Sequence, residues 1–519
     1  MGLLRFALAA SPIVLLLALV LRGQRTARAA TWIVLWVTVV GLVGFGATPA
    51  VLVVGVGKGL WLGTWILVVI WPALLLYRLA ARGGIESIGG WLARKLPRRG
   101  EMLLLVAWIF PSFVQGVAGF GTPIAIAAPL LVAMGWSPIK AVALPLIGYH
   151  WSVTFGSMGA SFFMASLVGG LDVAGQSSLG LRAGTLLAVQ CIAAGALVLL
   201  VDGGMQSLRS GSRLLVLAGA PMAAGLIVVA SSVPSVASLA AGTLGLLVVL
   251  LLARSERDAP VDDAATSGAV GIVTTGRVAR ILSPYAILLL TALPISLIPA
   301  LRTWSRGLGQ VAPAFPATTT AMGWENPAVA VYSPILPLGH PGAFIASAVL
   351  LGAVVYRLSG VWTPGMGRPM VTGWLRSLPA ASAPVLLLGC VATLMGDLGM
   401  IALLAENIAR AAGSAYPSAA PLVGGLGSFI TGSTTASNAL FAGLQSDVAL
   451  RLGLAPYELL AAQTAGGNVG NAISPVILLV GATAVGAEAR TGEILRAVLP
   501  AALVLFGVVV VTTTLTVLL

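Results

Sequence analysis

Charged residues are scarce in this chain. Of its 519 residues only 8% are Asp, Glu, Lys or Arg, whereas 58% are hydrophobic. A soluble protein of this length needs a more polar surface, so the composition excludes a water-soluble enzyme or binding module. Several windows of about 20 residues are nearly free of charge, and this is the length that a helix needs to cross hydrocarbon. We therefore predict an all-α polytopic membrane protein.

Histidine and cysteine are also rare, with two residues of each. Cys191 and Cys390 lie in apolar stretches without metal-ligand spacing, so we interpret them as small buried hydrophobic residues. The HExxH, GxSxG and GxxxxGKS motifs are absent. We predict no metal, no cofactor and no catalytic residues. A membrane-embedded enzyme stays a remote alternative, which would need acids or histidines clustered at an interface.

Acidic residues are outnumbered, with 15 Asp and Glu against 28 Lys and Arg, for a formal charge of +13. No basic tail or domain carries this excess, so we exclude nucleic acid as a partner. When the predicted helices are threaded through a membrane, most basic residues fall on the side of the Arg22–Arg28 loop. Such a bias marks the cytoplasmic side. The same threading puts Lys58 in an outer loop and leaves only Lys140 near membrane depth.

The apolar stretches predict about 12 transmembrane helices and two re-entrant hairpins, arranged as two halves. A charged linker without a helical pattern separates the halves. The first half is 1–253, with a hairpin at 102–136 that opens to the cytoplasm and a broken span at 139–168; the linker is 254–280; the second half is 281–519, with a hairpin at 421–452 and a broken span at 456–485. Unbroken spans are expected at Ala30–Val54, Leu60–Ala80 and Ala383–Leu404, among others.

Hydroxyl, amide and glycine residues cluster at two places inside this apolar sequence. Phe113–Pro123 reads FVQGVAGFGTP, and Gly427–Phe441 reads GSFITGSTTASNALF. Each is followed by an apolar half-length helix and then by a second polar patch, so one plan recurs in the two halves. Broken membrane helices at corresponding places in two halves are typical of inverted-repeat transporters, whose binding sites lie at the breaks. We predict this fold.

The breaks supply residues suited to a small organic anion. The helix after each hairpin tip directs its N–H groups and about half a positive charge at the break, which favours a carboxylate there. Hydroxyls and amides can serve the rest of a hydroxy acid. The alternative is that these small residues only allow close helix packing. The candidate substrate-binding residues are Gln115, Gly119, Thr122, His150, Ser433, Thr434, Thr435, Ser437, Asn438, Asn468, Asn471 and Ser474.

Two titratable residues are candidates for handling the coupling ion. Asp397 stands in the apolar sequence CVATLMGDLGMIALL, where a carboxylate is costly and by default functional. His150 can carry a proton near neutral pH. The structural alternatives are a carboxylate bonded to a neighbouring helix and a histidine bonded to a carbonyl. Na⁺ held by tip carbonyls, Ser437 and Asn438 is a competing hypothesis.

Five segments resemble the L-lactate permease family. FVQGVAGFGTPIAIAAPLLVAMG and LGSFITGSTTASNALFAGLQ are similar to its two signature regions, and HPGAFI, MGDLGM and AISP to further segments in the expected order. The resemblance implies a secondary transporter that carries lactate, and often glycolate, with protons across the bacterial plasma membrane. By analogy with related folds it also implies an elevator-like motion.

Two positions depart from the family pattern. Gln115 stands where many members have Glu, and Thr434 stands where many have Asp or Asn. With these two acids missing from the hairpin tips, Asp397 and His150 become the candidates to carry a proton.

We therefore expect a cation-coupled importer, with H⁺ before Na⁺, for lactate or a similar small 2-hydroxy monocarboxylate. Its expected partners are this anion, the cation and the lipid bilayer, and a homo-oligomer stays open. The alternative is a Na⁺-coupled transporter of another small organic anion, a dicarboxylate or a sulfonate. Two carboxylates would favour a fixed cation at membrane depth, and the sequence offers only Lys140, near an edge.

Overall fold

The computed structural model describes residues 2–518 apart from 94, 97, 120 and 256–274. Most of the predicted linker 254–280 lies outside the described residues, so only its flanks are seen: α11 (Ala237–Ser255) ends before it and α12 (Thr275–Leu297) begins within it. The described chain is almost entirely helical, as predicted.

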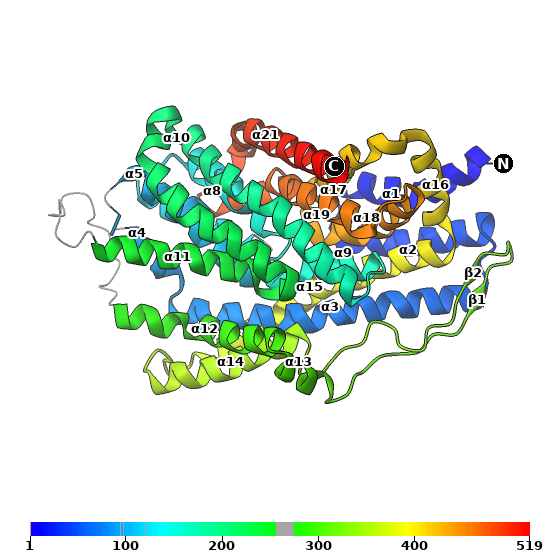
Figure 1. The fold of residues 1–519 in the computed structure, drawn as a ribbon, viewed down its shortest axis with the longest axis horizontal. Coiled ribbons are helices and arrows are strands. Elements are labelled where there is room, and N and C mark those ends of the chain that lie inside the picture. The colour runs from blue at the N-terminus through cyan, green and yellow to red at the C-terminus, as the bar shows by residue number, and fades with distance from the viewer. Residues whose placement is uncertain (1, 94, 97, 120, 256–274, 519) are drawn as a thin grey trace.

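The helices form two bundles packed side by side, with α3, α12 and α14 along one side of Figure 1 and α10, α17 and α21 along the other. We call the first the frame bundle, which contains α1 (Gly2–Leu21), α2 (Thr26–Gly44), α3 (Pro49–Gly83), α12, α13 (Pro299–Arg306), α14 (Pro341–Leu358) and α15 (Gly367–Asp397). We call the second the hairpin bundle, which contains α4 (Glu86–Ala93), α5 (Arg99–Leu104), η1 (Leu105–Ile109), α6 (Phe110–Val117), α7 (Thr122–Ala133), α8 (Pro138–Tyr149), η2 (His150–Ser152), η3 (Ser157–Gly159), α9 (Ala160–Val168), α10 (Val173–Ser232), η4 (Pro234–Val236), α11, α17 (Tyr416–Thr431), α18 (Thr434–Arg451), α19 (Pro456–Ala472), α20 (Pro475–Ala484), η7 (Glu488–Arg490) and α21 (Thr491–Leu518). Between them, α16 (Met400–Ala412) packs on both α1 and α18. Each predicted half thus supplies helices to both bundles.

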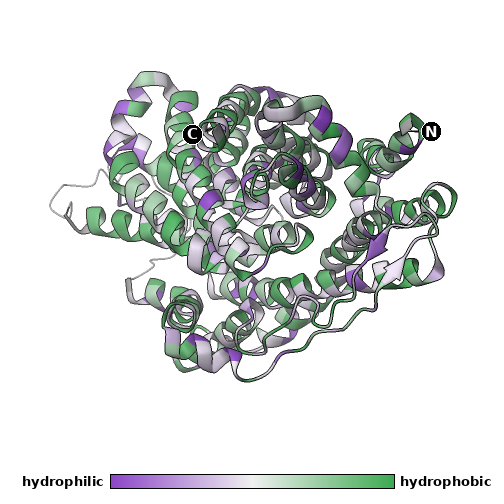
Figure 2. Ribbon diagram, turned by 45° about the vertical axis from the view of Figure 1, so that its right-hand side comes forward, coloured by the Kyte–Doolittle hydropathy of each residue, from purple (hydrophilic) through white to green (hydrophobic). Residues whose placement is uncertain are grey.

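Length and apolar composition allow 11 of the described helices to cross a membrane, or up to 12 if the bent pair α19–α20 counts as one span. This confirms the predicted fold class. Figure 2 shows hydrophobic residues along most of the helices, and many large hydrophobic side chains are exposed on the molecular surface. A surface of that kind is stable against lipid rather than water.

Helix α10 is two antiparallel arms rather than one span. Its backbone leaves the helical range at Gly203 and Gly204. A Cβ added at Gly180 would lie 2.1 Å from the carbonyl oxygen of Ala230, so the two arms are in direct contact. Close approach of this kind is what small residues permit in membrane helices. The separate spans that the sequence predicts on either side of this turn are therefore present.

The boundary between α2 and α3 differs from the prediction. We expected spans at Ala30–Val54 and Leu60–Ala80, whereas the two helices are separated at residues 45–48. Thr48 begins α3, because its hydroxyl accepts the Val51 N–H at 3.3 Å and a proline occupies the first helical position. The N-cap at Thr48 therefore sets the start of α3, and the glycines at positions 55–59 do not interrupt the helix.

Glycines explain why the expected loop near residues 55–59 is helical. Gly55, Gly59 and Gly63 recur at every fourth position and face α15. A Cβ at Gly59 would fall 2.4 Å from Cys390 Cα, and one at Gly63 would fall 2.9 Å from Leu386 Cα. A small residue at every fourth position lets two membrane helices approach this closely. These glycines are the packing surface between α3 and α15.

Lys58 therefore lies inside α3 and not in the predicted outer loop. Its ammonium nitrogen is 3.0 Å from each carboxylate oxygen of Asp397, and both residues are buried. Asp397 is the last residue of α15, so the predicted span Ala383–Leu404 is wrong: the chain turns at Gly399, where φ is +72°. Burying either charge without the other would be costly, so the pair fastens α3 to the end of α15.

Residues 307–340 run along the frame bundle as an extended segment (Figure 1). Within it β1 (Thr318–Thr319) pairs antiparallel with β2 (Glu325–Asn326). The Asn326 amide donates to the Asp397 carbonyl at 2.9 Å, which ties the segment to the end of α15. His340 closes the segment by accepting the Gly342 N–H at its Nδ1, and burial lowers the pKa of His340 to about 4. The neutral ring caps α14, which is a structural role.

Removal of one partner of the Lys58–Asp397 pair should destabilise the protein. Asp397→Asn leaves a buried ammonium without a counter-charge, at a cost of about 3–5 kcal/mol. We expect a lower melting temperature in detergent. The double variant Lys58→Met/Asp397→Leu should recover most of the loss, because two apolar side chains need no charge compensation. A double variant that melts as low as Asp397→Asn would contradict this account.

Candidate functional site

The first hairpin enters and leaves at the same end of the bundle. It runs through α5, η1 and α6 to a tip that includes Ala118, Gly119 and Gly121, and returns through α7. At its open end the Arg99 guanidinium lies 4.2 Å from the centre of the Trp136 ring. At its tip the Gly119 N–H donates to Ser157 Oγ at 3.0 Å. Gln115 is buried beside Gly156, while Thr122 begins α7.

The second hairpin consists of α17 and α18, joined at Gly432 and Ser433. Gly432 has a φ of +71°, a conformation that favours glycine. Ser433 caps α18, because its hydroxyl accepts the Ala436 N–H at 3.2 Å. The Ser437 hydroxyl donates to the Gly424 carbonyl at 2.9 Å and holds the two arms together. The hairpin begins at Tyr416, earlier than the predicted 421.

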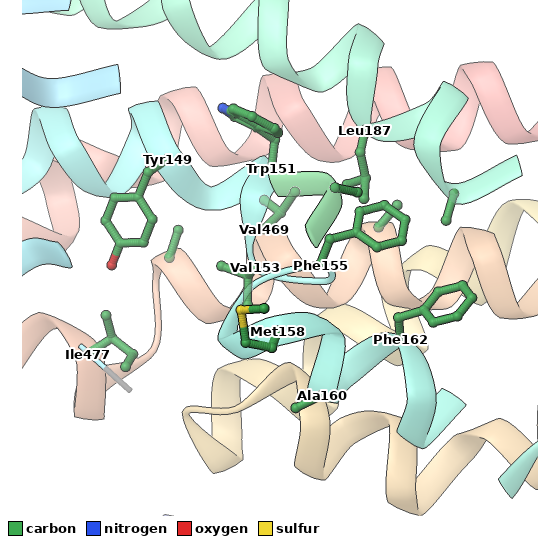
Figure 3. Packing of buried hydrophobic residues seen from close by; sticks show 14 of the residues in the cluster. Tyr149, Trp151, Val153, Phe155, Met158, Ala160, Phe162, Leu187, Val469 and Ile477 are labelled. Carbon is green, nitrogen blue, oxygen red and sulfur yellow. The ribbon is translucent and has the colours of Figure 1, made fainter. Parts of the chain in front are cut away.

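The first broken span is α8 and α9, separated by ten residues of short turns at 150–159. Ser157 and Met158 have φ of +46° and +58°, in the left-handed region that non-glycine residues rarely adopt. Figure 3 shows how the break is packed, with Phe155 beside Leu187 of α10 and Trp151 above Val469 of α19. Non-helical backbone survives at membrane depth only when protein covers it.

The second broken span, α19–α20, bends by 42° between its two helices. The short helix α20 lies against both hairpin tips. A Cβ at Gly432 would meet Val476 Cβ at 2.8 Å, and one at Gly121 would meet Val480 Cγ1 at 2.8 Å. Since these valines are one helical turn apart, the two tips lie close together.

A chain of hydrogen bonds connects the second hairpin to both broken spans. Asn438 Nδ2 donates to Thr464 Oγ1 at 3.0 Å, and Thr464 Oγ1 lies 3.0 Å from Thr154 Oγ1. Thr154 in turn donates to Asn468 Oδ1 at 3.0 Å. Each hydroxyl therefore donates once and accepts once. Gln463 Nε2 completes the set by donating to Asn438 Oδ1 at 3.2 Å.

Three of the predicted site residues are asparagines that also hydrogen-bond to backbone carbonyls of the breaks and the hairpin. Asn438 also donates to the Ser161 carbonyl, Asn468 to the Trp151 carbonyl and Asn471 to the Gly432 carbonyl. Sequence reasoning missed Thr464 and Gln463, although both lie in the helix directly before the predicted asparagines. The sequence did indicate both residues, because a threonine and a glutamine at membrane depth need hydrogen-bond partners.

The side chains named for a Na⁺ site are already engaged. Ser437 bonds to Gly424, and all the polar atoms of Asn438 have protein partners. In contrast, the buried hydroxyls of Thr434 and Ser474 have no partner within the described residues.

A cavity of about 270 Å³ lies between the two bundles at the tip of the second hairpin. The tip contributes hydroxyls, with Ser433 and Thr435 from the predicted set. The other walls are mostly aliphatic and belong to α15 and α20, together with Thr26 of α2 and Met164 of α9. No residue of the first hairpin tip is among the lining residues, which are Thr26, Met164, Ala380, Ala381, Pro384, Val385, Leu388, Thr431, Gly432, Ser433, Thr435, Ala436, Ala439, Val476, Ile477 and Val480.

The two coupling-ion candidates lie in different surroundings. His150 is buried in the first break, where its Nδ1 lies 2.8 Å from the Ile147 carbonyl and its Nε2 has no partner within the described residues. Asp397 belongs to the frame bundle and is neutralised by Lys58. Of the two, only His150 is adjacent to the hydrogen-bond chain, because the carbonyl of the next residue, Trp151, accepts from Asn468 Nδ2.

Sequence comparison identifies the family. The profile described as L-lactate permease matches residues 5–519. The chain belongs to the L-lactate permease family. It is accordingly a membrane transporter, and the resemblance noted in the two hairpin segments is confirmed over nearly the whole chain.

Individual relatives agree with this assignment. The L-lactate permease of Escherichia coli (strain K12) is 27% identical over 486 residues, which are 90% of this chain and 86% of that protein. The glycolate permease GlcA of the same organism is 27% identical over 477 residues, covering 84% and 81%. The crystal structure of the Alcanivorax borkumensis YdaH transporter matches with a TM-score of 0.54 and 15% identity, covering 95% of this chain and 98% of that one. The last comparison establishes a shared fold.

Removing the Thr464 hydroxyl should disturb this permease at its centre. Thr464→Val keeps the shape of the side chain but leaves the Thr154 hydroxyl and the Asn438 amide each one partner short, at about 1–3 kcal/mol. We expect uptake of labelled substrate by reconstituted protein to fall about tenfold. Thr243→Val is the matched control, because that hydroxyl bonds only within α11. Equal uptake by both variants would remove the network from the transport mechanism.

Proposed function

We propose that this permease imports lactate or a similar small 2-hydroxy monocarboxylate across the plasma membrane, coupled to H⁺. The observation that carries the proposal is the cavity at the tip of the second hairpin. It lies on the seam between the bundles, and its polar lining is confined almost entirely to that tip. The two relatives from Escherichia coli are permeases for lactate and glycolate, and both of these are acids of this class.

The tip is suited to a carboxylate. In the first turn of α18, the Ala436 and Ser437 N–H groups are bonded to Ser433. The Thr434 and Thr435 N–H groups have no partner within the described residues, and the positive end of the helix dipole points the same way. The hydroxyls of Thr431, Ser433 and Thr435 line the same wall. Thr431 donates to the Gly427 carbonyl and Thr435 is paired with Ser161 Oγ at 2.7 Å. Ser433 only accepts the Ala436 N–H, so its hydroxyl hydrogen can serve the carboxylate or a 2-hydroxyl.

The charge balance of the cavity favours a monoanion over a dicarboxylate. Its described lining contains no basic or acidic side chain. Lys58, which the sequence placed in an outer loop, is paired with Asp397 inside the frame bundle. It is therefore not available to a second carboxylate. A dianion would then lack a compensating charge at this depth, which is costly. The observation speaks against the dicarboxylate alternative.

The seam between the bundles supports alternating access by relative motion. Leaving aside Glu101, Arg213 and Arg277, the side-chain hydrogen bonds and ion pairs of the described residues stay within one bundle. Contacts across the seam are apolar: Trp65 and Phe163 have ring centres 4.8 Å apart, and Phe113 and Tyr285 5.2 Å. Sliding along such a seam breaks no polar contact. Rigid-body motion of one repeat or bundle against the other is the usual way in which transporters alternate access.

Uptake into proteoliposomes tests substrate and coupling together. We expect labelled lactate to accumulate when the outside is acidic, and we expect a Na⁺ gradient at equal pH to drive none. One proton per monoanion is electroneutral, so a membrane potential alone should have no effect, whereas each net charge would contribute about 2.3 kcal/mol per 100 mV. Accumulation only under the Na⁺ gradient would replace H⁺ by Na⁺, and none under either would refute the proposal.

His150 is the residue that we propose to carry the proton. His150→Gln should abolish accumulation under a pH gradient, because no group in the first break could then change its charge. Exchange of labelled for unlabelled lactate at equal pH should persist within about threefold, since it needs no net proton movement. Asp397→Asn serves as the comparison: its loss should lower stability and leave the pH profile of the remaining uptake unchanged. If the His150→Gln protein still accumulates lactate under a pH gradient, His150 does not carry the proton.

A further inference from the structure

The cavity has one polar wall and two aliphatic walls. The polar wall is the hairpin tip. The aliphatic walls are α20, with Val476, Ile477 and Val480, and one face of α15. The lining residues of α15 recur at the spacing of a single helical face and are Ala380, Ala381, Pro384, Val385 and Leu388. A 2-hydroxy acid with its carboxylate at the tip must therefore direct its C2 substituent at this face or at α20.

The cavity is larger than a three-carbon acid requires. For comparison with its volume of about 270 Å³, an apolar cavity of ~150 Å³ holds benzene, which has six non-hydrogen atoms. Lactate has the same number of non-hydrogen atoms and would leave part of this cavity unfilled. Since the surplus lies against aliphatic side chains, extra methyl or methylene groups would fit it better than water would.

The α15 wall is rigid, so its shape can select. The opposite face of α15 packs on the glycines of α3, close enough that neither helix can shift toward the other. Val385 and Leu388 are buried, whereas Ala380 and Ala381 are more open and leave the free space. Adding bulk at these alanines would narrow the cavity without touching the hairpin tip.

We propose that this permease accepts 2-hydroxy monocarboxylates with longer aliphatic substituents than lactate, and that the α15 wall, through Ala380 and Ala381, sets the upper limit. The inference rests on the proposed function. It adds a specificity-determining surface in the frame bundle, outside the segments that hold the carboxylate.

Competition with labelled lactate in proteoliposomes tests the inference. We expect 2-hydroxybutanoate and 2-hydroxy-4-methylpentanoate to inhibit the native protein with constants within about tenfold of unlabelled lactate. In Ala381→Leu the constant for 2-hydroxy-4-methylpentanoate should rise about tenfold or more, the order that misfit methylenes cost in an apolar pocket. Glycolate should change by less than about threefold, which also shows that the variant is folded.

Two further variants complete the design. Leu388→Ala enlarges the same wall and should improve inhibition by 2-hydroxy-4-methylpentanoate relative to glycolate. Ala7→Leu makes the same substitution as Ala381→Leu at an exposed position of α1 in the same bundle. It should change the inhibition constant of neither 2-hydroxy-4-methylpentanoate nor glycolate. Failure of the longer acids to inhibit the native protein, or an equal effect of Ala381→Leu on all acids, overturns the inference while lactate uptake upholds the proposed function. Absence of lactate and glycolate uptake by the native protein would instead overturn the proposed function.

Discussion

Backbone amides that leave a helix at membrane depth must find partners in the protein, because lipid supplies none. The architecture follows from meeting that demand at four places, two hairpin tips and two broken spans. The breaks support one another: Ser157 accepts the N–H of Gly119, Asn471 reaches the carbonyl of Gly432, and Asn468 reaches that of Trp151. Several of the candidate site residues are therefore also the groups that make the irregular backbone tolerable.

The frame bundle solves a different problem, which is to provide a stiff wall. Glycines along α3 let α15 approach within backbone contact, and the Lys58–Asp397 pair fastens one end of that interface. Nothing in this arrangement needs water or a ligand. The hairpin bundle thus contains the polar network and the frame bundle the close packing of α3 on α15, with the cavity on the seam between them.

The two bundles do not correspond to the two halves of the sequence. Each half donates its leading helices to the frame bundle and its hairpin and broken span to the hairpin bundle. Asn438 and Thr464 from the second half consequently meet Thr154 from the first. Direct hydrogen bonds therefore join the two halves of the sequence inside the hairpin bundle.

The sequence by itself determined the membrane class and the family, and it showed the polar clusters of Phe113–Pro123 and Gly427–Phe441 inside apolar stretches. These features depend on local composition: apolar runs of bilayer length, and polar clusters that no lipid-facing helix would carry. Only the tertiary structure decided that Lys58 is paired with Asp397, that Gly55, Gly59 and Gly63 are a packing surface, and that Thr464 and Gln463 complete the polar network. The local sequence around a glycine or a lysine does not show whether the residue lies in a loop or in a packed helix. That depends on the partner that packs against it, which is often hundreds of residues away in the chain.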